Sequence, residues 1–411
     1  MATQTTISVL AQHTASLKQV RFQPGAANNS VIATSSRDGS VHIWDLRCKG
    51  VGGPIQTIHM PLDGTDNPPN RVAPARFSYG CAVNSIYQTH HSAPLSRTAA
   101  QSISSNDGVS RGEAPGRAGD VSVTAIHFLP AGQEHLLLTA SEANATVKLW
   151  DIRSLQSTRR NAATATALSG TAQPQSHSQW RHFGVSSLNI SGDGSRLYAL
   201  CKDNTVYAYS MAHLIVGRAP ELSTSNPPRR RQMAEMQEGL GPIYGFRHPK
   251  LHVTSFYVKS AIRPAKNGKA EMLAVGSSGG STILFPTDER YRKHLENMSS
   301  ATVPSDQFGE KDQVQPPIRR TQSEVSNGPR VDDDVPIFQN GTPLVRGHDR
   351  EVGALTWTSE GELITVGDDF LVRCWREGDD ARDLRTGGEE GGRRWGSGWA
   401  EVSEMYDEDY E

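Results

Sequence analysis

The stretch VIATSSRDGSVHIWDLR, residues 31–47, decides the fold. Apolar and polar residues alternate on both sides of the Asp38–Gly39 turn, and this pattern predicts two antiparallel strands joined as a hairpin. A second copy, LLLTASEANATVKLWDIR, occupies residues 136–153. Because such self-similarity is typical of repeat architectures, we expect the chain to be assembled from copies of one small β unit.

Three weaker copies of the hairpin follow: LYALCKDNTVYAYSM, MLAVGSSGGSTILFP and LITVGDDFLVRCWRE. An additional apolar strand precedes every copy, so each unit has three strands and room for a less regular fourth. Four-stranded units of this kind are the blades of a β-propeller. The sequence therefore predicts an all-β propeller with five recognisable blades, at about residues 7–58, 120–155, 181–213, 251–289 and 344–380.

Long polar segments separate the predicted blades. They are rich in serine, proline, glutamine and charge, with too little apolar surface to offset the entropy of ordering, so we expect them to be largely disordered. The propeller is then a single domain spanning residues 1–400, followed by an acidic tail at 401–411. The expected insertions are residues 59–119, 155–180, 213–250 and 290–340.

Composition excludes several function classes for this chain of 411 residues. Its net charge of −2 is too balanced for a general nucleic-acid or membrane binder. No apolar run is long enough for a membrane helix, and the first residues do not form a signal peptide. The cysteines are widely spaced, which predicts free thiols in a reduced compartment and neither a disulfide framework nor a metal site: Cys48, Cys81, Cys201 and Cys374.

With its Trp44–Asp45 and Trp150–Asp151 dipeptides, the repeat resembles the WD-repeat family. The resemblance implies a hydrogen-bonded chain in each blade that gives buried polar groups partners and fixes the strand register. A hydrolase triad is the alternative for these side chains, and we favour the structural role. The implied network residues are His13, Ser36, Asp38 and Trp44 in the first copy, and His348, Asp368 or Asp369, and Trp375 in the last.

A narrower resemblance appears in the later copies. The pieces FYVKS at residues 256–260, AVGSSGGSTILF, GHDREVGALTW and GWA at residues 398–400 resemble, in the same order, segments of the denticleless-type substrate receptors of the cullin-4 RING ubiquitin ligase. The chain is similar to the last five of the seven blades of those receptors and lacks the first two. The resemblance implies a non-catalytic receptor for replication and cell-cycle proteins bound to the DNA sliding clamp, with no cofactor.

The same resemblance assigns two partner surfaces. In such receptors a Trp-Asp-x-Arg motif contacts the ligase adaptor, and its arginine can offer a two-pronged hydrogen bond to carboxylates or carbonyls. Blade packing alone is the alternative role for this motif. On the opposite face, Asp368 and Asp369 are candidates for reading a basic residue of the substrate, although aspartates in such turns also stabilise the turn itself. The expected adaptor-binding residues are Trp44, Asp45, Arg47, Trp150, Asp151 and Arg153.

Two further points bear on function. Arg229, Arg230 and Arg231 lie beside two prolines and fit a nuclear-import patch, or otherwise a solvated charge run. No phosphate-binding loop, nucleophile elbow or zinc-protease motif is present, so an enzyme is disfavoured. A WD-repeat scaffold in a chromatin or RNA-processing assembly is the alternative to the ligase receptor, and affinity purification of the ligase adaptor would distinguish them.

Overall fold

The computed structural model describes twelve stretches of the chain. Most of the residues predicted as insertions, the acidic tail and the Arg229–Arg231 run lie outside these stretches. The described residues are 8–25, 30–48, 78–90, 121–155, 166–174, 176–177, 182–216, 237–238, 240–266, 268–288, 335–344 and 347–377.

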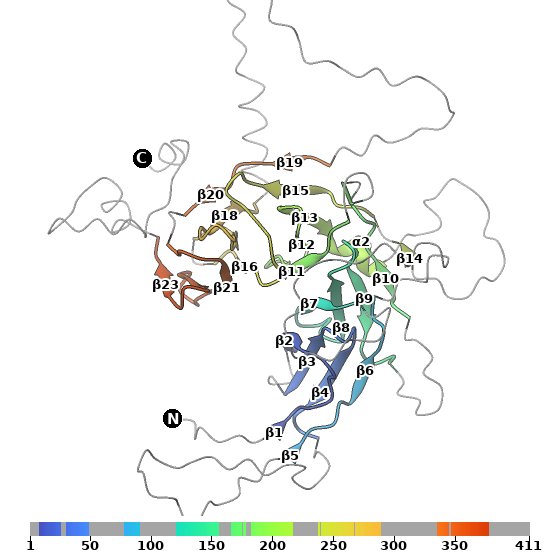
Figure 1. Ribbon diagram of the computed structural model, residues 1–411. Coiled ribbons are helices and arrows are strands. Elements are labelled where there is room, and N and C mark those ends of the chain that lie inside the picture. The colour runs from blue at the N-terminus through green and yellow to red at the C-terminus, as the bar shows by residue number, and fades with distance from the viewer. Residues whose placement is uncertain are drawn as a thin grey trace, which may run out of the picture.

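The strands form five antiparallel blades that follow one another around an arc, as Figure 1 shows, and the predicted all-β fold with five blades is confirmed. Each blade starts with an inner strand on the concave side and continues outward through a hairpin. The three main strands of each blade are β2 (Leu17–Phe22), β3 (Val31–Ser36) and β4 (Val41–Asp45); β7 (Val123–Phe128), β8 (Leu136–Ser141) and β9 (Lys148–Asp151); β11 (Val185–Ile190), β12 (Arg196–Cys201) and β13 (Thr205–Ser210); β16 (Ser260–Arg263), β17 (Met272–Val275) and β18 (Ile283–Pro286); β21 (Val352–Trp357), β22 (Leu363–Gly367) and β23 (Val372–Trp375).

The outer strands of blades 1 to 3 come from within the expected insertions, and that of blade 4 lies just after the last of them. These strands have only two to four residues, too few for an alternating pattern to stand out in the sequence. A short helix, α2 (Met211–Val216), follows β13. The outer strands are β6 (Asn84–Ile86) in blade 1, β10 (Ser169–Gly170) with β14 (Gln237–Glu238) in blade 2, β15 (Tyr244–Arg247) with β19 (Ile337–Phe338) in blade 3, and β20 (Thr342–Pro343) in blade 4.

A shared irregularity shows that the blades are copies of one unit. The register of the inner strand shifts after its first residue in blades 1, 2, 3 and 5, between Leu17 and Gln19 in the first case. Such a bulge bends the strand and increases its twist. The bend occurs near the end where each inner strand enters the blade.

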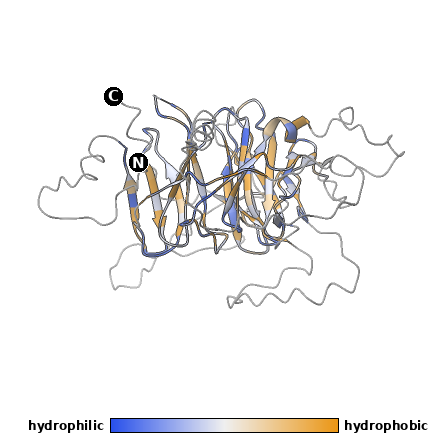
Figure 2. Ribbon diagram, turned by 90° about the horizontal axis from the view of Figure 1, so that it is seen from above, coloured by the Kyte–Doolittle hydropathy of each residue, from blue (hydrophilic) through white to orange (hydrophobic). Residues whose placement is uncertain are grey.

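The hydrophobic core lies between successive blades. Inner strands pack in the order β2, β7, β11, β16 and β21, and a separate apolar cluster fills each of the four junctions. Figure 2 shows the hydrophobic residues concentrated along the strands. The junction between blades 4 and 5 has the smallest cluster, formed by Ala274, Leu344, Leu363 and Trp375.

The arc does not close through its described strands. No contact comparable to those between successive blades joins blade 5 to blade 1, and Figure 1 shows these blades apart at its two ends. Blade 1 leaves Leu17, Val20 and Phe22 about half exposed. Blade 5 leaves Phe370 97% and Val372 68% exposed, so both ends of the arc present apolar surface to solvent.

Candidate docking site

The hairpins give the arc two faces that differ chemically. Strands β4 and β9 end at Asp45 and Asp151 on one face, which we call the docking face. The turns that join the second and third strands lie at the opposite ends of those strands, on what we call the turn face. Since antiparallel strands alternate in direction, blades 1 and 2 contribute their Trp-Asp-x-Arg segments to the docking face, and every blade contributes the turn between its second and third strands to the turn face.

Arg47 forms a two-pronged ion pair with Asp45 at the end of β4. Its Nε donates to Oδ1 of Asp45 at 2.9 Å and its Nη2 donates to Oδ2 at 2.7 Å. These hydrogen bonds lower the pKa of Asp45 and raise the pKa of Arg47. The Arg47 side chain is 63% exposed. The aspartate therefore orients the guanidinium, whose remaining donors point to solvent as far as the described residues show.

Arg153 repeats this geometry one blade further on. Its Nε and Nη2 each lie 3.2 Å from the two carboxylate oxygens of Asp151, and its side chain is 66% exposed. Burial acts to raise the pKa of Asp151, but the hydrogen bonds from Arg153 outweigh it and the pKa lies below its usual value. Two guanidinium groups with the same support are thus presented on one face.

The rest of each motif holds the arginine in place. Trp44 and Trp150 are fully buried, so they anchor the strand ends and are not accessible to a partner. The outer strand of blade 1 supports the second motif directly, because Asn84 Nδ2 donates to the carbonyl oxygen of Ile152 at 2.8 Å. Asn84 is a supporting residue that the sequence did not reveal, since nothing in its surroundings distinguishes it from other polar residues.

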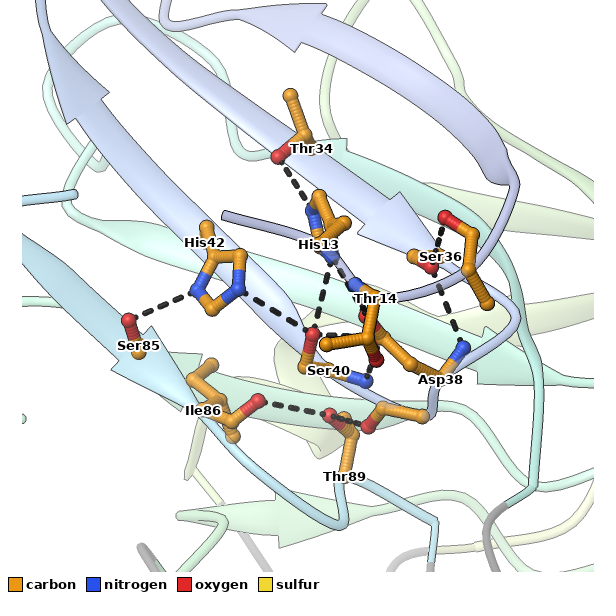
Figure 3. Close-up of polar contacts among 12 residues, drawn as sticks. His13, Thr14, Thr34, Ser36, Asp38, Ser40, His42, Ser85, Ile86 and Thr89 are labelled. Atoms are coloured by element: carbon orange, nitrogen blue, oxygen red, sulfur yellow. Dashed lines mark hydrogen bonds and ion pairs between the residues drawn. The ribbon is translucent and has the colours of Figure 1, made fainter. Parts of the chain in front are cut away.

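On the turn face, a hydrogen-bonded network joins three segments of blade 1, as Figure 3 shows. Nε2 of His13 is hydrogen-bonded to Thr34 Oγ1 at 2.8 Å, and Nδ1 lies 3.2 Å from Asp38 Oδ2. Trp44 Nε1 donates to the same Thr34 hydroxyl at 2.8 Å. Burial acts to raise the pKa of Asp38, while its bonds with His13 and Ser40 lower it far below the usual value. The network therefore links the Asp38 turn to the second strand, β3, and to the third strand, β4.

Ser36 has a different place from the one that the resemblance implied. Its Oγ donates to the carbonyl oxygen of Ala15 at 3.1 Å and accepts from the backbone nitrogen of Asp38 at 3.2 Å. Ser36 therefore ties the turn to the loop before β2, whereas Thr34 receives the indole proton of Trp44. The threonine lies two residues earlier on β3 and points to the same face of the strand.

The same arrangement occurs in blade 2, where the sequence did not reveal it. His90 Nε2 is hydrogen-bonded to Thr139 Oγ1 at 2.9 Å, and Trp150 Nε1 donates to that hydroxyl at 2.9 Å. All three side chains are buried. An insertion separates His90 from the rest of its blade, so proximity in sequence gave no signal. The threonine is a recognisable sequence signal, because it occurs in every second strand whose blade has a tryptophan on the third strand: Thr34, Thr139 and Thr365.

In blade 5 the network separates the two candidate substrate-reading aspartates. Both oxygens of Asp369 lie 3.1 Å from His348 Nδ1, and the pKa of Asp369 is lowered to about 2 because hydrogen bonds from His348 and two backbone amides outweigh burial. His348 also reaches Thr365, to which Trp375 donates. Asp369 is therefore held within the blade, whereas Asp368 is exposed.

Blades 3 and 4 carry neither the tryptophan nor the arginine. Tyr209 and Phe285 take the tryptophan position and are buried. Between these blades the docking face has a groove of about 960 Å³ with mixed charge, lined by Lys266, Lys269 and Glu271 among others. The paired arginines are thus confined to one end of the arc, while its middle offers a groove lined by side chains of both charges.

Within the described residues, no three His, Cys, Asp or Glu side chains gather closely enough to hold a metal ion. No helix in this part of the chain is long and apolar enough to cross a membrane. The described cysteines are free thiols, with Cys201 buried and the other three exposed.

Comparison with known proteins agrees with this architecture. The WD domain, G-beta repeat pattern matches residues 4–45 and 341–376. The chain is 25% identical to cell division cycle protein cdt2 of Schizosaccharomyces pombe over 88% of its own length and 48% of that protein. It is 26% identical to a denticleless protein homolog of Danio rerio, covering 89% of this chain and 38% of the relative. The human denticleless protein homolog is 27% identical over 49% of this chain and 23% of its own length.

The chain therefore carries WD40 repeats and is homologous to the cdt2 and denticleless proteins, and the resemblance noted in the sequence is confirmed. It spans less than half the length of each of these three relatives. Among solved structures, a chain of the Chaetomium thermophilum Polycomb Repressive Complex 2 bound to GSK126 has a TM-score of 0.46 and 13% identity, covering 90% of this chain and 74% of that one. That likeness is too remote to bear on function.

Proposed function

We propose that this chain is a non-catalytic, nuclear substrate receptor of a cullin-4 RING ubiquitin ligase. In this role one face of the arc binds the ligase adaptor and the other presents replication or cell-cycle proteins bound to the DNA sliding clamp. The homology to the cdt2 and denticleless proteins supports the proposal. A propeller with two chemically different faces is suited to holding two proteins in fixed geometry, and the ubiquitin-transfer chemistry then belongs to other subunits.

The observation that carries the adaptor role is the matched pair Arg47 and Arg153. Each guanidinium is oriented by its own aspartate, so little side-chain freedom is lost when a partner binds. Each retains donors that can meet a carboxylate or a backbone carbonyl of the adaptor. Blade packing alone does not require both arginines to be about two-thirds exposed on the same face.

For the substrate side, we assign the contact with a basic residue to Asp368 and not to Asp369. Asp369 is already hydrogen-bonded to His348. Asp368 is exposed on the turn face, and Phe370 beside it is 97% exposed with a positive φ of 62°. A positive φ is unfavourable for a bulky residue, and such backbone conformations gather at functional sites. A carboxylate next to an aromatic ring is chemically suited to a lysine or arginine side chain.

The adaptor role is tested by replacing both arginines, Arg47→Ala with Arg153→Ala. Truncation of interface arginines often costs about 2 kcal/mol or more, which corresponds to roughly thirtyfold in affinity. We expect the double variant to lose retrieval of the ligase adaptor while its unfolding midpoint stays close to that of the original chain. The matched control is Arg247→Ala, because Arg247 is also a half-exposed arginine beside an aspartate, Asp203, but lies on the turn face.

Loss and retention of adaptor binding in the double variant lead to opposite conclusions. Loss of adaptor binding in the double variant, with binding retained in Arg247→Ala, supports the docking role. A folded double variant that retrieves the adaptor at original levels contradicts it. In that case a scaffold role outside ubiquitin transfer becomes the better proposal for the function of the chain.

A further inference from the structure

The register shift of the inner strands sets one residue apart in each of four blades. These bulge residues are Lys18, Thr124, Ser186 and Gly353. Thr124 Oγ1 donates to the carbonyl oxygen of Val185 in the next blade at 2.5 Å. Ser186 Oγ donates to the carbonyl oxygen of Phe256 in the next blade at 3.1 Å. Gly353, the bulge residue of blade 5, has no side chain that could make such a contact.

The space beside Gly353 is bounded by two oxygen acceptors. A Cβ atom added to Gly353 would lie 3.8 Å from the carbonyl oxygen of Tyr257 and 4.0 Å from Oδ1 of Asp368. Apart from its own chain neighbours, it would meet no other described atom within 4 Å. The backbone does not require glycine here, because Gly353 is not among the glycines with a positive φ. We call this space the Gly353 slot.

The carbonyl oxygen of Tyr257 has no hydrogen-bond donor among the described residues. The carbonyl oxygens on either side of it, those of Phe256 and Val258, accept from Ser186 Oγ in blade 3. Successive carbonyl groups of an extended segment point in opposite directions, and that of Tyr257 accordingly faces Gly353 in blade 5. It is therefore an unused acceptor at the slot.

Two carboxylates near the slot have no ion pair within the described part of the chain, Asp368 and Glu351. Asp368 is exposed. Glu351 accepts from Ser255 Oγ at 2.5 Å and from Ser278 Oγ at 2.9 Å, and these neutral hydroxyls leave its charge in place. The third carboxylate of this region, Asp369, is held by the histidine network of blade 5. The slot therefore lies in negatively charged surroundings.

Three cations lie in the same region of the chain. Lys18 Nζ lies 5.4 Å from the centre of the Tyr257 ring, and Arg350 precedes Glu351 in the sequence. Neither of these two forms an ion pair with a carboxylate of the slot region as far as the structure describes it. Lys259 Nζ donates to a backbone carbonyl of blade 3 at 2.7 Å. The acceptors of the slot are thus available to a cation from another molecule.

We propose that the Gly353 slot receives the ammonium group of a lysine side chain of the protein substrate. The inference rests on the proposed substrate role of Asp368 and adds to it a second acceptor, the Tyr257 carbonyl, and the space that Gly353 leaves. An ammonium group is a compact charge with three donors, which suits two oxygens on either side of one small space. The exposed ring of Phe370 can pack against the methylene groups of the same lysine.

The experiment uses the full chain and two peptides, acetyl-Gly-Gly-Lys-Gly-Gly-amide and the same peptide with Nε-acetyllysine, with binding measured by saturation-transfer difference NMR. We expect the acetyllysine peptide to bind about tenfold more weakly or worse, because acetylation removes the charge. Gly353→Thr fills the slot with the side chain that blade 2 has at its bulge, Thr124. It should weaken binding of the lysine peptide about fivefold or more.

The matched control is Gly241→Thr. Gly241 also has open space around its Cβ position and no positive φ, but it lies between β14 and β15 at the outer edge of the arc. This control should leave binding of the lysine peptide unchanged. A second variant, Lys18→Gln, removes the cation nearest to the Tyr257 ring and should leave binding unchanged or tighten it, because a like charge is removed.

The proposal is overturned if the lysine peptide does not bind, if both peptides bind equally well, or if Gly353→Thr binds the lysine peptide as tightly as the control does. If Asp368→Asn weakens binding and Gly353→Thr does not, the contact assigned to Asp368 stands and the slot is wrong. Should Gly353→Thr fail to fold by near-ultraviolet circular dichroism, Gly353→Ala decides, with an expected loss of about threefold.

Failure of the slot and failure of the receptor role are distinguishable. Retrieval of the ligase adaptor depends on the docking face, so Gly353→Thr should retrieve the adaptor as the original chain does. Loss of lysine-peptide binding with adaptor retrieval intact supports the slot. Absence of adaptor retrieval in the original chain would contradict the receptor role and would leave the peptide measurements to decide the slot on their own.

Discussion

At the scale of residues, one threonine hydroxyl joins the histidine to the buried tryptophan in each of blades 1, 2 and 5. Thr34, Thr139 and Thr365 hold this position in blades 1, 2 and 5. A buried indole N–H without an acceptor costs free energy, so the threonine determines whether tryptophan can be accommodated at the end of the third strand. Blades 3 and 4, which have Tyr209 and Phe285 instead, are built without this linkage.

We predict that Thr139→Val destabilises the chain more than its change in size explains. Valine keeps the shape of threonine but leaves Trp150 Nε1 and His90 without their shared partner, at about 1–3 kcal/mol for each unsatisfied group. The free energy of unfolding in urea measures the loss. Thr139→Ser, which keeps the hydroxyl, is the control, and equal destabilisation by both substitutions would show that the hydrogen bonds contribute little.

A second residue-scale prediction concerns pH. Burial lowers the pKa of His42 to about 4, and burial with the nearby Lys148 lowers that of His90 to about 3. Their unfolded value is about 6.5, so stability from these neutral histidines is fully present above pH 6.5 and decreases as the pH falls toward 3. Asp369, with a folded pKa of about 2, adds a loss only below pH 4. We therefore expect the melting temperature to fall steadily between pH 6.5 and pH 4.5.

The histidines can be separated from other acid effects. A His90→Gln chain should be less stable at pH 7.5 than the original chain, but its melting temperature should decrease less steeply between pH 6.5 and pH 4.5. A melting temperature of the original chain that rises as the pH falls over this interval contradicts the prediction.

At the scale of elements, the sequence revealed the hairpins and not the outer strands. Alternation around Asp38 and around Asn144 predicted two strands each, because five or six alternating residues carry a recognisable period. Strands such as β10 and β20 have two residues each, and their pairing depends on the neighbouring strand and not on their own pattern. The motif arginines were predicted from the resemblance, whereas Asn84 and His90 act across insertions that hide their partners in sequence.

The Trp-Asp-x-Arg element gives a prediction with two opposite expectations. Trp150→Ala removes a side chain that is almost completely buried in the junction between blades 1 and 2, and should destabilise the chain by about 3–5 kcal/mol. Arg153→Ala removes an exposed side chain and should leave stability within about 0.5 kcal/mol. Urea unfolding of both variants measures the contrast. Comparable destabilisation by both would mean that the arginine packs the blade and is not held for a partner.

At the scale of the whole molecule, the five blades act as a row of nearest-neighbour contacts. Each junction has its own apolar cluster, and among the described strands no corresponding contact joins the two ends. A closed ring would share one more junction, so the open arc has less buried surface for the same number of blades. The end surfaces of blades 1 and 5, which border the opening, are consequently the least stabilised parts of the propeller.

The last prediction follows from that opening. Leu17, Val20 and Phe22 form one exposed apolar strip on β2, and exposed strips of this kind promote association. We expect the chain to associate at micromolar concentrations and to melt at or below the 45–65 °C that is usual for mesophilic domains. Replacing the strip, with Val20→Lys and Phe22→Lys, should shift light scattering toward monomer with little change in melting temperature, because these side chains bury little surface in the isolated chain. The control Val206→Lys changes a fully buried valine and should unfold blade 3 instead. If the original chain is monomeric and melts well above 65 °C, the strip is covered in solution and the arc closes.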